Sequence, residues 1–248
     1  MAKRIGQRNL GQRLALGLTL AALLTLGSAL ALADQTYSME SIKPPTSAHV
    51  SQTIADAIQS SGTRVIGDSD GAKTTICEIF WARSIYRQDR PPDARQLLYA
   101  NLKPGTFMGV VHFLVTERYV REYRSQMIKP GYYTMRYAAL PESTNGNELD
   151  LVLLSSLSVD RNPSQVPPID ELVRRSRLVS RTKRPMMMSL VEVDTDQKFP
   201  SLITDDEGTC VLQVQLPVAV SKSKVSGTPQ KMPIALIVVT SIPEDLGD

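Results

Sequence analysis

Residues 74–81 read TTICEIFW, a run of β-branched and aromatic side chains that is typical of a β-strand. Cys77, Ile79 and Trp81 alternate along this run and form its more uniformly apolar face. Apolar residues at every second position are the pattern of a strand that covers a hydrophobic core on one side. We therefore predict a strand here, with these three side chains directed inward.

Further segments of the chain have the same strand character, and turn or loop residues separate most of them. They are residues 108–115, 132–137, 149–154, 186–193, 209–216 and 234–240. The apolar face of the 209–216 run consists of Cys210, Leu212, Val214 and Leu216. Because strands outnumber helices, we predict a mainly β fold, an antiparallel β-sandwich over residues 63–248 with one or two short helices.

Two Pro-Gly pairs predict turns of one type. Lys103-Pro104-Gly105 and Lys129-Pro130-Gly131 each precede a predicted strand. Proline fixes φ at the second position of a type II turn, and glycine tolerates the positive φ of the third. Both segments are therefore expected to form type II turns.

Two segments have helical character. Residues 50–58 carry apolar side chains at helical spacing after Ser51, a residue that can cap a helix, so residues 34–62 are expected to form an extended arm and a short helix. A second helix is predicted over residues 168–181, where Pro168 suits the first turn, acidic residues follow it and basic residues lie near the end.

Residues 67–71 read GDSDG, a spacing found in the nucleophile elbow of hydrolases and in half of a calcium loop. An elbow needs a helix after Ser69, whereas the residues that follow have strand character. In a calcium loop, Ile66 and Cys77 would occupy the first and last ligand positions, and neither side chain offers an oxygen. We therefore interpret the segment as a turn.

The sequence offers little other support for catalysis or metal binding. Asp68 and Asp70 are weak candidates for holding an ion. Of the two histidines, His49 lies in the predicted arm, and His112 lies within an apolar strand, where we expect a buried ring. No phosphate or dinucleotide loop is present, so no cofactor is predicted. Met186-Met187-Met188 is expected to fill the core rather than to bind a metal.

The first 33 residues resemble a signal peptide. Four basic residues precede an uncharged apolar run that begins at Leu14, and Ala31-x-Ala33 matches the site that signal peptidases cleave. This pattern predicts export to the periplasm or the extracellular space. The alternative is a membrane anchor that retains residues 14–33.

Removal of this segment would change the charge of the protein. The full chain has a net charge of +3, but four of its 28 basic residues and none of its 25 acidic ones lie in residues 1–33. The remaining chain would carry 24 basic and 25 acidic side chains, a net charge of −1. No nucleic-acid partner is therefore expected, since a general basic character is absent and aromatic residues make up only 5% of the chain.

The chain has two cysteines, Cys77 and Cys210, on apolar faces of different predicted strands. In an exported protein, an even number of cysteines favours a disulfide. A bridge between these positions would stabilise the fold by about 4–5 kcal/mol on the chain-entropy model. We predict this bridge, with two buried thiols as the alternative.

Two groups of residues are candidates for ligand binding. Tyr132 and Tyr137 belong to a tyrosine-rich set that could form a ligand-binding face, with packing between strands as the alternative. Arg174, Arg175 and Arg177 belong to a basic run on the second predicted helix, which could contact an anionic component of the cell envelope or another protein. The alternative is a solvated helix face.

Three segments of the chain carry a resemblance: ICEIFWAR (76–83), LKPGTFMGVVHF (102–113) and IKPGYYTMRYAALPE (128–142). In these segments the chain resembles a loose group of uncharacterised secreted bacterial proteins. The "PGYYTMRY" strand is also similar to the P-x-G-x-Y-x-L strand of many extracellular β-sandwich modules. The resemblance implies a β-sandwich and an envelope location, and it assigns no catalytic residue.

These observations favour an exported, non-catalytic binding or interaction module of the envelope or the extracellular space. The alternative is a secreted hydrolase whose acidic residues are brought together only by the fold.

Overall fold

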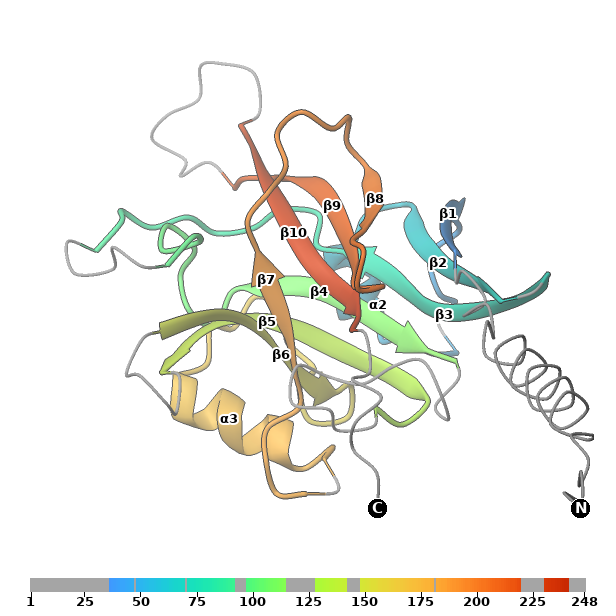
Figure 1. The fold of residues 1–248 in the computed structure, drawn as a ribbon. Coiled ribbons are helices and arrows are strands. Elements are labelled where there is room, and N and C mark those ends of the chain that lie inside the picture. Colours follow the sequence, from blue (N-terminus) through green and yellow to red (C-terminus); the bar gives the residue numbers. More distant parts are fainter. Residues whose placement is uncertain are drawn as a thin grey trace, which may run out of the picture. The chain divides into compact units, whose positions relative to one another are not determined.

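Antiparallel strands form one 10-stranded sheet in the computed structural model (Figure 1). The strands are β1 (Thr36–Ile42), β2 (Gly62–Ser69), β3 (Ala72–Trp81), β4 (Phe107–Phe113), β5 (Gly131–Pro141), β6 (Glu148–Ser156), β7 (Met187–Val191), β8 (Ser201–Thr204), β9 (Cys210–Pro217) and β10 (Lys231–Val239). The described residues also form two helices, α2 (Gln52–Ala57) and α3 (Ile169–Arg177). The mainly β prediction is therefore confirmed.

The structure describes residues 36–46, 48–69, 71–91, 97–114, 128–141, 148–180, 182–219 and 230–240. The predicted signal peptide, residues 1–33, and Asp70 lie outside these ranges. Within them, no helix has the length and apolar character needed to cross a membrane.

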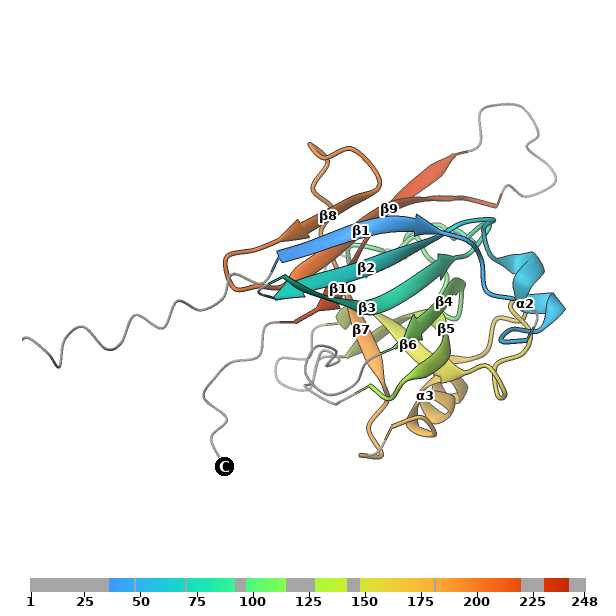
Figure 2. The same cartoon turned by 90° about the vertical axis from the view of Figure 1, so that its right-hand side faces the viewer.

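The sheet is nearly closed into a barrel-like form, so the predicted sandwich is not confirmed. Its strand order is β1-β2-β3-β4-β5-β6-β7-β10-β9-β8, and the edge strands β1 and β8 lie side by side (Figure 2). Bulges in the pairings β2–β3, β4–β5 and β9–β10 accompany the curvature. Alternation identifies the face of a strand that is buried, but a curled sheet buries that face against itself and needs no second sheet.

The interior of the curled sheet is the main hydrophobic core. Cys77, Ile79 and Trp81 are all buried in it, as predicted, and so are the alternating apolar residues of β9. Gln213 lies on the other face of β9 and is buried as well. Its side-chain oxygen accepts a hydrogen bond from the Asp194 N–H at 2.9 Å, which offsets the cost of burying this polar group.

Helix α3 covers the outer face of the sheet beside β6 and forms a second, smaller core. Leu172 of α3 packs there with Leu151, Leu153 and Met187. The three consecutive methionines fill the core, as predicted. Met187 packs in the smaller core under α3, while Met186 and Met188 pack in the main core. The helix begins after Pro168 and ends at Arg177, four residues before the predicted end.

The predicted arm contains a strand that the sequence did not indicate. β1 pairs with β2 over seven positions, from Thr36 opposite Asp68 to Ile42 opposite Gly62. As an edge strand, β1 exposes one face to solvent and therefore contains polar residues at positions where a central strand would be apolar. The short helix that follows is confirmed, and the Ser51 hydroxyl accepts a hydrogen bond from the Ile54 N–H.

Two of the three predicted turns are confirmed. In the GDSDG segment, Ser69 pairs with Ala72, and Gly71 adopts a φ of 82°, which closes a hairpin between β2 and β3. Thr106 donates a hydrogen bond to the Lys103 carbonyl at 3.0 Å across Gly105, which has a φ of 88°, as a type II turn requires. Gly131 has a φ of 141° and belongs to β5, so the second Pro-Gly segment does not have the predicted geometry.

Candidate functional site

The two tyrosines predicted to bind a ligand are occupied by intramolecular contacts. Tyr137 is buried in the main core, and its hydroxyl donates a hydrogen bond to Asp150 Oδ1 at 2.7 Å, so its assignment to a ligand face is corrected. The Tyr132 ring lies between the two histidines of the chain, with ring centroids 3.8 Å from His112 and 5.2 Å from His49. Neither face of Tyr132 is therefore open for stacking on a ligand.

His112 belongs to a polar row that crosses five strands on the outer face of the sheet. Consecutive partners in the strand register are Glu40, Arg64, Glu78, His112 and Tyr132. Glu78 accepts hydrogen bonds from Arg64 at 2.7 Å and from His112 Nδ1 at 3.0 Å. The prediction of a buried His112 ring is corrected, because the alternation of β4 places this residue on the outer face, where it is partly exposed.

The side chains of this row mainly hold neighbouring strands together. Burial alone would raise the pKa of Glu78, but the hydrogen bonds from His112 and Arg64 outweigh burial and hold the pKa below its usual value. A carboxylate that orients an imidazole resembles part of a catalytic triad. Among the described residues, however, no serine, threonine or cysteine hydrogen bonds to His112. The row instead links strands β1 to β5 through side-chain contacts.

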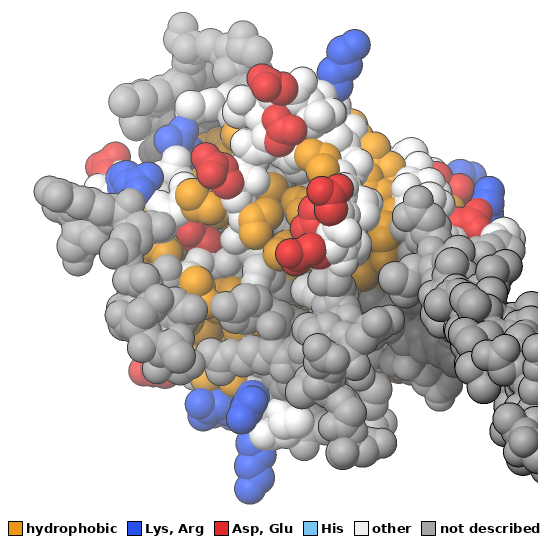
Figure 3. Space-filling view, viewed as in Figure 1, with side chains coloured by type: hydrophobic (Ala, Val, Ile, Leu, Met, Phe, Trp, Pro, Cys, Tyr) orange, Lys and Arg blue, Asp and Glu red, His pale blue; other side chains and the backbone are white. Residues whose placement is uncertain are grey.

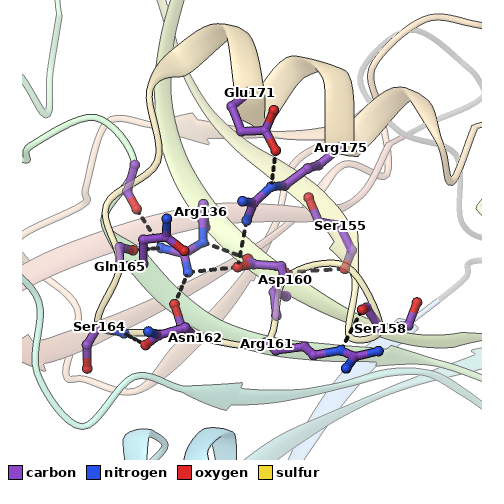
Figure 4. Close-up of polar contacts among 12 residues, drawn as sticks. Arg136, Ser155, Ser158, Asp160, Arg161, Asn162, Ser164, Gln165, Glu171 and Arg175 are labelled. Carbon is purple, nitrogen blue, oxygen red and sulfur yellow. Dashed lines mark hydrogen bonds and ion pairs between the residues drawn. The ribbon is translucent and has the colours of Figure 1, made fainter.

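The three predicted arginines of α3 have different environments. Arg175 is largely buried and donates hydrogen bonds to Glu171 at 2.8 Å and to Asp160 at 3.3 Å, so it is not available to an external ligand (Figure 4). Arg174 is exposed and pairs with Glu171, and these arginines lower the pKa of Glu171 to about 2. Arg177 is exposed and takes part in none of the ion pairs between described residues.

Arg136 was not predicted as a special residue, yet it has the most extensive polar contacts in this region (Figure 4). Its side chain is fully buried, and it forms two hydrogen bonds with Asp160, at 2.6 and 2.9 Å. Its remaining N–H groups donate to the carbonyls of Gly105, Asn162 and Gln165. All five donors of the guanidinium are thus used to hold the segment before α3 against β5.

The predicted disulfide is absent from the structure. Cys77 and Cys210 both face the core, but they are free thiols outside bonding distance. They lie on strands that are separated by β2, β1 and β8 around the curled sheet, whereas the prediction assumed two facing sheets. Burial raises the pKa of the Cys77 thiol above its usual value, and it raises that of Cys210 to about 12. Both thiols are therefore protonated and unreactive at neutral pH.

The weak metal candidates gain no support. The Asp68 side chain accepts a hydrogen bond from the Gly71 N–H at 2.9 Å and so stabilises the turn of the hairpin. Across the described parts of the chain, no group of three or more His, Cys, Asp or Glu residues could hold a metal ion.

A cavity of about 360 Å³ lies where the two edges of the sheet meet, and we call it the seam cavity. Its apolar lining includes Met39 of β1, Trp81 of β3, Phe199 and, on β9, Val214 and Leu216. Its polar lining comes from Glu40, Ser41, Gln59, Ser61, Thr63, Gln215 and Lys231. The lining is therefore mixed, and a hollow that combines apolar side chains with polar groups can bind a ligand that has both kinds of surface.

The cavity exists because β8 is short. β8 pairs with β9 only from Ser201 opposite Gln213 to Thr204 opposite Cys210. In the described structure, the edge of β9 beyond Ser201 is uncovered at Gln215, whereas Ile85 pairs with the same edge from Pro217 onward, and Phe199 and Pro200 border the space that remains. An uncovered strand edge presents backbone N–H and C=O groups that can pair with another chain.

The register shows which backbone groups face this open edge. Gln215 pairs with Pro233 of β10, and proline has no N–H to exchange across an antiparallel pair. Two residues further along β10, the Ala235 N–H donates to the Tyr99 hydroxyl at 2.9 Å and so points away from β9. Both observations place Gln215 at a position where its own N–H and C=O point away from β10, toward the open edge.

Trp81 adds an unsatisfied donor beside the cavity. Its ring is buried, and its indole N–H has no hydrogen-bond partner among the described residues. A buried donor without a partner costs about 1–3 kcal/mol. An acceptor that a ligand brought to this N–H would remove that cost.

Sequence reasoning placed Trp81 on the inward face but did not identify the seam cavity. Pro233 lies directly before the predicted strand 234–240 but within the observed β10, and proline in a strand marks a position without a pairing partner on one side. Comparisons with protein-family models, with curated proteins and with solved structures found no match for this chain.

Proposed function

We propose that the protein is an exported, non-catalytic binding module, and that the seam cavity holds an extended segment of a peptide. Export is supported by the signal-peptide pattern of residues 1–33. The observation that carries the binding proposal is the open edge of β9 at Gln215, next to a cavity whose lining is partly apolar.

An extended peptide suits both features of the cavity. Its backbone can pair with the N–H and C=O of Gln215, in the gap on the edge of β9 between β8 and Ile85. Because side chains alternate along a strand, every second residue of the peptide would point toward Trp81, Met39 and Leu216. Backbone pairing supplies affinity in this mode, and the apolar lining selects the side chains.

The hydrolase alternative finds less support in the described cavities. A glycosidase-like mechanism needs two carboxylates on opposite sides of a cleft. Glu40 is the single acidic residue in the lining of the seam cavity, and Glu192 is the single one in a second cavity, of about 410 Å³, beside Tyr99. The resemblance to secreted bacterial β-sandwich proteins stays a prediction.

Replacement of Gln215 by proline should weaken peptide binding by about tenfold, because it removes one backbone donor from the open edge. The probe would be the tightest Trp-free peptides from a displayed random library of 12-residue sequences. Trp81 is the only tryptophan of the chain, so its fluorescence reports occupancy of the seam cavity directly.

Gln215→Ala is the matched control, since it removes the side chain but keeps the N–H, and it should bind within about threefold of the wild type. Proline at this position breaks no bond to β10, so both variants should unfold at similar temperatures. Equal affinity for the two variants, or binding that leaves Trp81 fluorescence unchanged, would show that the peptide does not use this edge. A library that yields no binder would reject the peptide as the ligand.

Export predicts a specific mature chain. Expression in a bacterial host with a secretion pathway should yield protein that has lost residues 1–33 and begins at Asp34, as measured by intact mass. Recovery of a chain that retains residues 14–33 in the membrane fraction would instead support the anchored alternative.

A further inference from the structure

We infer that the C-terminal end of α3 and the turn that follows it form a docking surface for a bilayer that contains anionic lipids. This surface consists of Arg174, Arg177, Leu178, Lys183 and Arg184, all of which are exposed. It is distinct from the seam cavity, and its argument rests on charge, exposure and backbone geometry.

The first observation is an exposed apolar side chain among cations. Leu178 is 62% exposed, the largest exposure among the large hydrophobic residues that the structure describes. It follows Arg174 by four residues and therefore lies on the same side of the helix, opposite the face that buries Leu172 and Ser176. An apolar residue surrounded by basic ones is the composition of surfaces that insert shallowly into a lipid interface.

The second observation is that most of this charge is not neutralised within the protein. Glu171 pairs with Arg174 and Arg175, but no ion pair between described residues involves Arg177, Lys183 or Arg184. Figure 3 shows Lys and Arg side chains gathered at the lower edge of the view, the side on which α3 lies in Figure 1. Three such cations within eight residues of the chain, at exposed positions, are complementary to an anionic surface.

The third observation is the backbone of the turn. Lys183 has a φ of 60°, the only positive φ of a non-glycine residue in the described parts of the chain. This left-handed conformation is unfavourable for a side chain such as lysine, and strain of this kind is often retained at binding sites. Burial of Arg175 and Leu172 fixes α3 against the sheet, so the surface is presented on a rigid support.

The test is sedimentation of the mature chain with vesicles, since Gln35–Asp248 forms its own compact unit. The wild type should bind vesicles of phosphatidylglycerol and phosphatidylcholine at a 3:7 ratio, and not vesicles of phosphatidylcholine alone. Binding should be lost in 0.5 M NaCl, where screening is strong. Each basic residue near an anionic surface contributes about fivefold, so Arg177→Gln/Lys183→Gln/Arg184→Gln should reduce the partition coefficient about 100-fold.

The matched control is Lys43→Gln/Lys73→Gln/Lys198→Gln, which removes the same charge from exposed positions on other elements and should leave binding nearly unchanged. Leu178→Asn should reduce binding about fivefold without changing its salt dependence. No binding to the anionic vesicles, or equal losses in the two triple variants, would overturn the docking surface. An unchanged partition coefficient for Leu178→Asn would overturn the insertion of Leu178.

Discussion

Replacement of Arg136 by methionine should lower the free energy of unfolding by about 3 kcal/mol, the lower end of the cost of breaking a buried ion pair, because Asp160 then keeps, among the described side chains, only the longer contact with Arg175 and the Thr134 hydroxyl. Methionine keeps much of the volume, but Asp160 loses both hydrogen bonds from the guanidinium, and three backbone carbonyls lose theirs. Asp160 is as buried as Arg136, so its carboxylate cannot be compensated by water. Equilibrium unfolding in urea measures the change.

Two variants separate the buried pair from surface electrostatics. Arg136→Met combined with Asp160→Asn should be more stable than Arg136→Met alone, because the carboxylate that has lost the Arg136 guanidinium is then uncharged. Arg174→Met breaks an exposed pair with Glu171 and should cost less than about 1 kcal/mol. If Arg136→Met were as mild as Arg174→Met, the pair with Asp160 would not hold the segment before α3 in place.

Replacement of Gly109 by alanine should lower the free energy of unfolding by about 3 kcal/mol or more. Gly109 has a φ of 142°, and an added Cβ would lie 2.3 Å from the Phe80 carbonyl oxygen and 2.9 Å from Trp81 Cα. These are backbone atoms of the neighbouring strand β3, so no side-chain rotation can relieve the overlap. The pairing of β3 with β4 would have to open next to Trp81.

Gly71→Ala is the appropriate comparison. Gly71 also has a positive φ, of 82°, but a Cβ there would meet no atom within 4 Å. This variant should cost only about 1–2 kcal/mol, the cost of a left-handed conformation for a residue with a side chain. The difference between the two variants in urea unfolding then measures the overlap together with the less favourable φ of Gly109. Equal losses would contradict the close approach of β3 and β4.

Much of the secondary structure could be predicted because side chains in strands alternate strictly. The periods of residues 74–81 and 209–216 identified the buried faces of β3 and β9 correctly. The pattern failed where a strand lies at an edge or is very short. β1 is polar because solvent covers one of its faces, and the four residues of β8 are too few to show a period.

The candidate site was less predictable than the strands. Trp81 was placed inward, but the seam cavity depends on the point at which β8 stops relative to β9, a matter of register between segments far apart in the chain. Tyrosine and arginine are common in ligand sites, but Tyr137 and Arg175 donate hydrogen bonds to Asp150 and Asp160 within the protein and so support the fold. Such partners cannot be identified before the strands are placed in order.

The sequence by itself determined the strand character of the chain, the inward side of its central strands, the GDSDG hairpin and the two short helices. These depend on local spacing and on the conformations that glycine and proline allow. Only the tertiary structure decided that the sheet curls onto itself, that Cys77 and Cys210 remain apart, and that Arg136 is buried. The physical reason is that local alternation records which side of a strand avoids water, whereas closure, register and burial depend on which distant segment covers that side.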